Sequence, residues 1–175
     1  NPETVGVIAG DLNEVEGLKA AKDLFDSLGV KNIDCRQDGS PIGTGPRESY
    51  LFNSTIAGVN QADAILLVGV NPRVEAAVLN ARIRQRWLNS DMTVGVIGEA
   101  ADLTYDYEHL GDKPADIEAL GSKRTGFIQT LKEAKRPMII VGAGALARED
   151  GAQVLRAAGA LADKIGAVSA DWNGF

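Results

Sequence analysis

Runs of apolar, mostly branched residues without polar alternation recur along this chain. Such runs are typical of strands that are covered on both faces of a parallel sheet. The clearest are residues 64–68 (AILLV), 93–97 (TVGVI) and 137–141 (PMIIV). Asn71 and Pro72 end the first of them, because proline lacks the N–H that a ladder needs. An apolar stripe then follows at Leu79, Ile83 and Trp87 and predicts a helix. These elements form a βαβ unit, for which a right-handed crossover is expected.

The rest of the chain continues the same alternation. Further strands are expected at residues 4–9 and 30–34, and another begins at 167–170. Amphipathic helices are expected at residues 15–28 and 151–165, and shorter helical turns within 50–62, 114–120 and 126–134. Irregular connections are expected at residues 36–48 and 99–114, the first serving a function, an external contact or packing against a neighbour.

Helix ends carry recognisable capping residues. Asn13 is the expected N-cap of the first helix, and Gly29 its C′ residue. Asp150 with Gln153 resembles a capping box at the start of the last helix, which Gly166 closes.

Four or five strands that alternate with helices on both faces predict a three-layer, doubly wound, mostly parallel α/β sheet of Rossmann-like type. At 175 residues the chain is long enough for one domain with its own core. We therefore expect a single α/β domain over residues 1–175, excised from a longer chain, with a possible subdivision near 112–125.

Composition excludes several classes of function. The net charge of −6 argues against a nucleic-acid partner, which is held by clustered Lys and Arg. No apolar run approaches the roughly 20 residues of a membrane-spanning helix, so direct membrane insertion is not expected. Cys35 and His109 are the only cysteine and histidine, and a cysteine-ligated zinc or iron–sulfur site needs two to four thiolates. We expect no metal site and no resident cofactor in this chain.

The turn after residues 64–68 is the first candidate site. It contains Gly69, Asn71 and Pro72, between the carboxyl end of a central strand and the start of a helix, where ligands of such sheets bind. Asn71 would contact a base or ribose edge. The alternative is a tight turn that requires glycine and proline for its geometry alone.

A second, weaker candidate is the sequence from Gly142 to Ala147. Gly142 and Gly144 approximate the dinucleotide fingerprint G-x-G-x-x-G/A, with Asp171 as a ribose-binding acid. The helix is expected to start only at Gly151, and Asp171 lies beyond the usual spacing of about 20 residues. Both departures disfavour NAD binding.

Other charged groups admit two interpretations each. His109, beside Glu108 and Asp106, is either an acid–base residue or a structural histidine, and no nucleophile motif accompanies it. Four arginines on the central helix form either a solvated helix face or a docking surface for an acidic neighbour. They are Arg73, Arg82, Arg84 and Arg86.

Longer strings of residues resemble known families. Residues 62–72 (ADAILLVGVNP) and 81–84 (ARIR) resemble the guanine-dinucleotide domain of the molybdopterin oxidoreductases. A more specific resemblance is to the large iron–sulfur subunit family of respiratory complex I, and it covers nearly the whole chain. It is carried by residues 53–59 (NSTIAGV), 71–76 (NPRVEA), 102–111 (DLTYDYEHLG), 131–138 (LKEAKRPM) and 171–173 (DWN).

The resemblance implies a subunit of NADH:quinone oxidoreductase, peripheral on the matrix side of the mitochondrial inner membrane or the cytoplasmic side of the bacterial one. Other complex I subunits would be its partners. In that family 4Fe–4S and 2Fe–2S clusters belong to cysteine-rich domains N-terminal to this region. In the related molybdenum enzymes an Asp-Pro-Arg-like turn helps to hold the guanosine, whereas this chain has Gly98-Glu99-Ala100. Glu99 is thus the one acidic candidate left in a relic pocket.

Three functions follow from these patterns. The first is a non-catalytic structural domain of the complex I large iron–sulfur subunit, supporting electron transfer from NADH to quinone by clusters outside this chain. The second is a nucleotide-binding domain, like that for molybdopterin guanine dinucleotide, in a molybdenum oxidoreductase. The third is a stand-alone NAD-binding enzyme. The lone cysteine, the lone histidine and the missing acidic turn favour the first.

Overall fold

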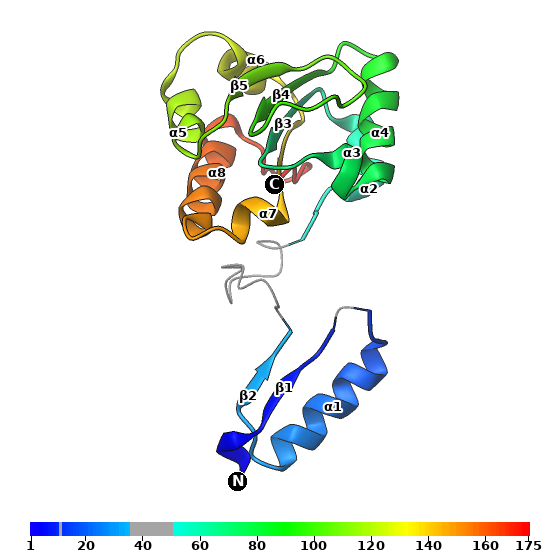
Figure 1. The fold of residues 1–175 in the computed structure, drawn as a ribbon. Coiled ribbons are helices and arrows are strands. Elements are labelled where there is room, and N and C mark those ends of the chain that lie inside the picture. The colour runs from blue at the N-terminus through cyan, green and yellow to red at the C-terminus, as the bar shows by residue number, and fades with distance from the viewer. Residues whose placement is uncertain (11, 36–50) are drawn as a thin grey trace. The chain divides into compact units, whose positions relative to one another are not determined.

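The computed structural model describes residues 1–10, 12–35 and 51–175 of the chain. The chain divides into two units, Asn1–Gly39 and Ser40–Phe175, and each is described by itself (Figure 1). The expected irregular connection at residues 36–48 lies outside the described residues. A single domain over residues 1–175, with a subdivision near 112–125, stays a prediction.

The first unit is a parallel pair of short strands with one helix. Its elements are the 3₁₀ turn η1 (Pro2–Thr4), β1 (Gly6–Ile8), α1 (Val15–Ser27) and β2 (Asn32–Asp34). Gly6 pairs with Asn32, and Ile8 with Asp34. The first strand starts later than its apolar pattern predicts because residues 2–4 form the 3₁₀ turn, which Asn1 caps.

The ends of α1 test the predicted caps. The prediction that Asn13 is the N-cap is wrong: Glu14 holds that position, and the Asn13 Nδ2 donates to the Gly10 carbonyl at 3.4 Å. Gly29 follows the helix with φ +74°, as predicted for a residue that must leave a helix in the left-handed region.

The second unit contains a four-stranded sheet in the order β5-β4-β3-β6, with every neighbouring pair parallel. The strands are β3 (Ala64–Val68), β4 (Thr93–Ile97), β5 (Glu108–Gly111) and β6 (Pro137–Val141). The helices are α2 (Thr55–Gly58), α3 (Pro72–Glu75), α4 (Ala77–Leu88), α5 (Ala115–Ser122), α6 (Phe127–Glu133), α7 (Ala143–Leu146) and α8 (Gly151–Ile165), with η3 (Val59–Gln61) after α2. The predicted doubly wound α/β fold is confirmed.

Strand β5 lies within the stretch that the pattern assigns to an irregular connection, so that assignment is wrong in part. Glu108 and His109 are exposed, and Leu110 is only half-buried, because β5 is an edge strand. A register shift between Val96 and Ile97 further interrupts its pairing with β4. An edge strand with polar residues has no apolar run by which to recognise it.

The sheet has a separate hydrophobic core on each face. Along β3, Ala64, Leu66 and Val68 face α5, α6 and α8, whereas Ile65 and Leu67 face α4 and η3. Figure 1 shows α5, α6 and α8 on one side of the strands and α2, α3 and α4 on the other. All five side chains are at most 3% exposed, so β3 is covered on both faces, as its unbroken apolar run predicts.

The helical segment between β3 and β4 is broken in two. Ala76 separates α3 from α4 with φ −148° and ψ 64°, a conformation outside the helical region. In α4 the predicted stripe is confirmed, since Leu79 and Ile83 are buried and Trp87 packs partly against the same core.

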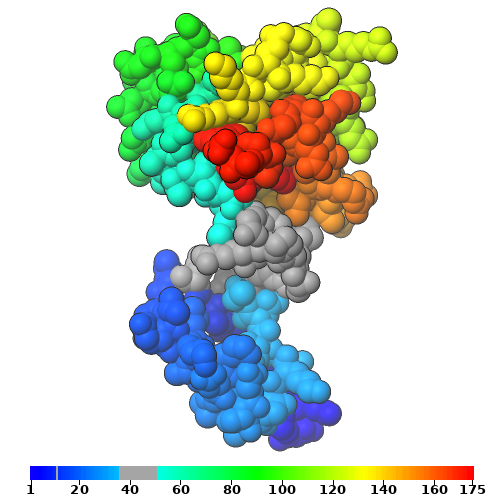
Figure 2. Space-filling view, turned by 180° about the vertical axis from the view of Figure 1, so that it is seen from behind, coloured from blue at the N-terminus to red at the C-terminus, as the bar shows by residue number. Residues whose placement is uncertain are grey.

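The C-terminal part of the chain departs from two predictions. Asp150 does not form the predicted capping box, because its carboxylate accepts hydrogen bonds from Arg148. Residues 167–170 do not form a strand; Val168 makes only an isolated bridge with Asn173. The last residues bind the segment before α2 instead, where Asn53 Nδ2 donates to the Phe175 carbonyl at 2.7 Å. Figure 2 shows this C-terminal segment between the residues after Leu51 and α8.

Candidate functional site

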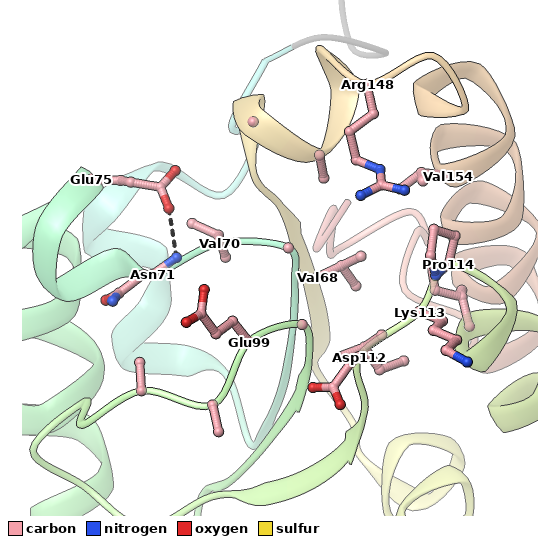
Figure 3. Close-up of a pocket in the computed structure, with 18 residues that line it drawn as sticks. Val68, Val70, Asn71, Glu75, Glu99, Asp112, Lys113, Pro114, Arg148 and Val154 are labelled. Carbon is pink, nitrogen blue, oxygen red and sulfur yellow. Dashed lines mark hydrogen bonds between the residues drawn. The ribbon is translucent and has the colours of Figure 1, made fainter.

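The order of the strands in the second unit defines where a ligand would bind. Chain connections run from β3 outward through β4 to β5 and then return to the other side of β3 at β6. The order therefore reverses between β3 and β6, and ligands of open α/β sheets bind at the carboxyl ends of the strands at such a point. A cleft of about 560 Å³ lies there (Figure 3). The candidates Gly69, Asn71, Glu99 and Gly144 all line it.

The glycines beside this cleft allow the strand-end turns to pack directly on one another. A Cβ on Gly142 would overlap the carbonyl oxygen of Gly69, and a Cβ on Gly69 would lie 2.6 Å from the Cβ of Ala145. Gly98 packs on the backbone of Gly69 and has φ +145°. Close packing of three turns thus accounts for these glycines without a ligand.

The Asn71 side chain is used by its own helix. Its Oδ1 accepts from the Arg73 N–H at 3.2 Å, as an N-cap does, and its own N–H donates to Glu75 Oε1 at 2.7 Å. Figure 3 shows this hydrogen bond and the Asn71 amide directed away from the centre of the cleft. Pro72 is buried at the first position of α3 and does not line the cleft.

The loop at Gly142 differs from the sequence prediction. A helix does start on it, because Gly142 is the N-cap of α7, but this helix is only four residues long. The expectation that the helix starts only at Gly151 is therefore corrected: α8 starts there, after α7 has ended. A Cβ on Gly144 would meet nothing within 4 Å, so this residue leaves open space at the cleft. Asp171, the proposed ribose acid, lines a separate pocket with Asn53 and Trp172.

The cleft also contains charged residues that sequence reasoning did not identify. Asp112 and Lys113 follow the unrecognised strand β5, and Arg148 follows the unrecognised helix α7. Arg148 is paired with Asp150, its Nε lying 2.7 Å from Asp150 Oδ1. This hydrogen bond lowers the pKa of Asp150 and raises that of Arg148. Sequence reasoning missed these residues because it recognised neither β5 nor α7, the elements that they follow.

Acidic groups outnumber unpaired basic groups around the cleft. Glu75, Glu99 and Asp112 line it, and in Figure 3 the Glu99 carboxylate extends toward the Asn71 segment. Lys113 is the basic lining residue without an acidic partner within hydrogen-bonding distance among the described residues, since Arg148 is paired with Asp150. Among the described lining residues, this balance of charges is unfavourable for a pyrophosphate.

His109 joins two turns of the sheet edge. Its Nε2 lies 2.8 Å from the Gly98 carbonyl and 3.0 Å from Asp112 Oδ1. Both partners accept, so Nε2 carries the proton. These contacts fit the structural interpretation of His109.

The arginines of the helical segment hold the connection between β4 and β5. Arg73 donates to the Asp102 carbonyl at 3.0 Å and pairs with its carboxylate, and Arg84 Nε donates to the Thr104 carbonyl at 3.1 Å. A backbone hydrogen bond from Thr104 and then the bond from Arg73 lower the pKa of Asp102. Arg86 Nε donates to another carbonyl, that of Ala62, at 2.9 Å, so three of the four arginines have a structural role that their spacing did not reveal.

A buried polar pair fastens the same connection to α4. Asn80 Nδ2 donates to the Leu103 carbonyl at 3.2 Å, and the Tyr105 hydroxyl donates to Asn80 Oδ1 at 2.9 Å. Burial raises the pKa of Tyr105. The ring of Tyr105 lies 6.5 Å from that of Trp87, centroid to centroid.

The described residues offer neither a metal site nor a membrane-spanning helix. They contain no group of three or more His, Cys, Asp and Glu residues placed to hold a metal ion. Among their helices, none is both long and apolar enough to cross a membrane.

Comparison with known proteins relates the whole chain to one family. The family model for molybdopterin oxidoreductases matches residues 1–175. The chain is 42% identical over 174 residues to the mitochondrial NADH dehydrogenase (ubiquinone) iron-sulfur protein 1 of Solanum tuberosum, covering 99% of this chain and 24% of that protein. It is 45% identical over 175 residues to the mitochondrial NADH-ubiquinone oxidoreductase 78 kDa subunit of Neurospora crassa, covering 96% of this chain and 23% of that protein. The chain thus spans about a quarter of the length of these relatives.

A solved structure shares the fold. A chain of the formyltransferase/hydrolase complex FhcABCD from Methylorubrum extorquens, solved with methylofuran, superposes with a TM-score of 0.56 at 18% identity. The match covers 93% of this chain and 50% of that one. At this identity the likeness concerns the fold alone.

Proposed function

The chain belongs to the molybdopterin oxidoreductase family, and we propose that it is a non-catalytic structural domain within the large iron–sulfur subunit of NADH:quinone oxidoreductase. The observation that carries this proposal is the state of the cleft at the strand ends. Its fold position is that of a ligand site, but its glycines pack against one another and its asparagine caps a helix.

The guanine dinucleotide of the molybdenum enzymes does not fit these residues. Its phosphates would need several free N–H groups or cations close together. The described lining offers one unpaired cation, Lys113, and three acidic residues, Glu75, Glu99 and Asp112. Its guanine would need a firmly placed acceptor, and Glu99 is exposed on a turn that starts with Gly98.

The relatives are named as iron–sulfur subunits of NADH dehydrogenase, and we propose that this chain is part of such a longer subunit. Electron transfer from NADH to quinone would pass through 4Fe–4S and 2Fe–2S clusters bound elsewhere in the parent protein. Its partners would be other complex I subunits. The parent would be peripheral, on the matrix side of the mitochondrial inner membrane or the cytoplasmic side of the bacterial one.

The cleft itself is the observation that favours a second function, nucleotide binding. Its volume and its place at the point where the strand order reverses are those of a working site. The stand-alone NAD enzyme is less well supported, because α7 is too short to present a helix dipole to a pyrophosphate.

Titration calorimetry with GDP separates the structural and nucleotide-binding functions. We expect binding no tighter than about millimolar, a free energy of about −4 kcal/mol, which non-specific phosphate contacts can supply. NADH should give the same weak result. Micromolar GDP binding that is lost in Glu99→Ala would instead establish a nucleotide site.

A control variant and a metal analysis complete this test. Glu118→Ala removes an exposed acid that lines the groove between α5 and α8 instead of the cleft, so it reports any general effect of net charge. Elemental analysis of the purified chain for iron and molybdenum tests the absence of a resident metal. Stoichiometric metal would contradict the structural interpretation, whatever the titration shows.

A further inference from the structure

Helix α4 carries an unpaired apolar stripe on the side that faces away from the sheet. Val78 is 68% exposed and Leu88 is 54% exposed, although both are large aliphatic residues. Ala81 and Gln85 lie between them and are also exposed. The opposite side of the helix holds the buried residues Leu79, Asn80 and Ile83. The helix is thus apolar on both sides, and only one side is covered by the second unit.

The spacing of the exposed stripe is that of a helix–helix seam. Val78, Ala81, Gln85 and Leu88 follow one another at intervals of three, four and three residues, which are the a and d positions of two heptads. In this register Arg82 takes the e position and Arg84 the g position. These border positions choose the partner of such a seam through their charge.

The charge of α4 indicates the chemistry of what covers it. Residues 77–88 carry three arginines and no acidic residue, in a chain whose net charge is −6. Arg82 makes no hydrogen bond or ion pair within the part of the chain that the structure describes, and Arg84 uses only its Nε, toward the Thr104 carbonyl. A complementary helix would therefore carry Asp or Glu along both borders of its apolar face.

A second copy of this chain does not meet that requirement. In an antiparallel pair the e and g positions face their own equivalents, so Arg82 would oppose Arg82 and Arg84 would oppose Arg84. In a parallel pair neither arginine would meet an acid. Gln85 at an a position and the flanking arginines also keep the stripe compatible with water, as suits a surface that is covered after the chain has folded.

We propose that the stripe formed by Val78, Ala81, Gln85 and Leu88 is the docking surface for an amphipathic helix of another subunit, with acidic residues at its borders. This inference rests on the proposed function, because it assumes that the chain works inside a multi-subunit assembly.

Photo-cross-linking in the intact complex tests the proposal directly. The full-length parent is expressed with a benzoylphenylalanine replacing Val78, the complex is purified and irradiated, and the cross-linked peptide is sequenced. We expect one product of higher mass, in which the cross-linked peptide belongs to a different subunit and is helical, with Asp or Glu at its borders. The same replacement at Lys132, which is exposed on α6, should not give that product.

Charge reversal at one border position provides an independent measurement. Arg82→Glu should lower the recovery of the parent chain in the complex about tenfold at low salt, whereas Arg82→Lys should leave recovery within about twofold. Both variants of the isolated chain should melt as the wild type does, because Arg82 makes no hydrogen bond or ion pair with a described residue. Equal recovery of the two variants would contradict the acidic partner.

The outcomes separate this inference from the function on which it rests. If the parent chain does not copurify with the respiratory complex, the proposed function fails. If it copurifies but position 78 gives no cross-link, cross-links within its own chain, or reaches a segment without acidic borders, only the docking surface is overturned.

Discussion

The hydrogen bond between Tyr105 and Asn80 holds the connection between β4 and β5 against α4, and its removal should cost measurable stability. Tyr105→Phe deletes the hydroxyl that donates to Asn80 Oδ1 at 2.9 Å. Both side chains are only 6% exposed, so water cannot replace the lost donor without opening the core. Asn80 Nδ2 would keep its hydrogen bond to the Leu103 carbonyl, but Asn80 Oδ1 would have no donor.

The expected loss follows from the burial of that acceptor. A buried polar atom left without a partner costs about 1 to 3 kcal/mol, more than the net contribution of about 1 kcal/mol from an ordinary hydrogen bond. For a domain of this size the corresponding fall in melting temperature is roughly 3 to 10 °C. The aromatic contact with Trp87 should persist, because the ring is unchanged.

Urea unfolding and calorimetry of the chain measure this loss. Tyr107→Phe is the matched control: its hydroxyl is also hydrogen-bonded, to the backbone of Ala101, but Tyr107 is half-buried and water can replace the hydroxyl. The control should lose less than about 1 kcal/mol. The double variant Asn80→Leu/Tyr105→Phe should lose less than the sum of the two single variants, because each single variant already breaks the same Tyr105–Asn80 hydrogen bond. A loss below about 0.5 kcal/mol in Tyr105→Phe, or strict additivity in the double variant, would refute the reasoning.

Three further predictions use the same unfolding measurements. Burial raises the pKa of Tyr105, so the neutral Tyr105 contributes fully to stability below about pH 10, and this contribution is lost as the pH rises above that value. The free energy of unfolding should therefore fall less steeply with rising alkaline pH in Tyr105→Phe than in the wild type. Gly142→Ala should destabilise the chain by about 1 to 3 kcal/mol, because its Cβ overlaps the Gly69 carbonyl, and Gly144→Ala should change it by at most about 0.5 kcal/mol. Thr104 has φ +70°, which costs a β-branched residue about 1 to 2 kcal/mol, so Thr104→Gly should leave the urea midpoint unchanged or raise it.

The buried parts of the fold could be predicted because their residues repeat one physical condition. Strand β3 is covered on both faces, so each of its residues from Ala64 to Val68 is apolar, and the pattern gives its bounds correctly. The apolar pattern also gives the bounds of β4 and β6 correctly. Strand β5 has one free edge and exposes Glu108 and His109, so its polar residues are indistinguishable from those of a loop until the neighbouring strand is seen.

Local capping was less predictable because several partners compete for the same side chain. Asp150 has the sequence position of a capping residue, but Arg148 is two residues away and binds the carboxylate more strongly than a backbone N–H would. Asn13 likewise bonds the Gly10 carbonyl rather than the start of α1. A capping propensity describes which hydrogen-bond partner a side chain finds on average, and it does not identify the partner in one particular structure.

A cleft lies at the turn that the sequence marks as a candidate site, but its use could not be derived from sequence. Gly69 and Gly142 are far apart in the chain, and nothing in their own neighbourhoods shows that the carbonyl of one occupies the Cβ position of the other. The glycines of a dinucleotide loop and the glycines of interlocking turns satisfy the same steric requirement, close approach of another group to the backbone.

Because of that shared requirement, a fold would keep the shape of a site even after the site had lost its ligand. If the glycines at the ends of β3 and β6 served only a ligand, loss of the ligand would leave them free to be replaced. Here the two turns pack on each other, so Gly69 and Gly142 are needed for the sheet to close its carboxyl end whether or not anything binds. Side chains that only a ligand would need face no such constraint, and the turn Gly98-Glu99-Ala100 differs from the Asp-Pro-Arg-like turn that the resemblance to the molybdenum enzymes implies. The structural proposal therefore depends on the side chains around the cleft, and its retained shape is not an argument against it.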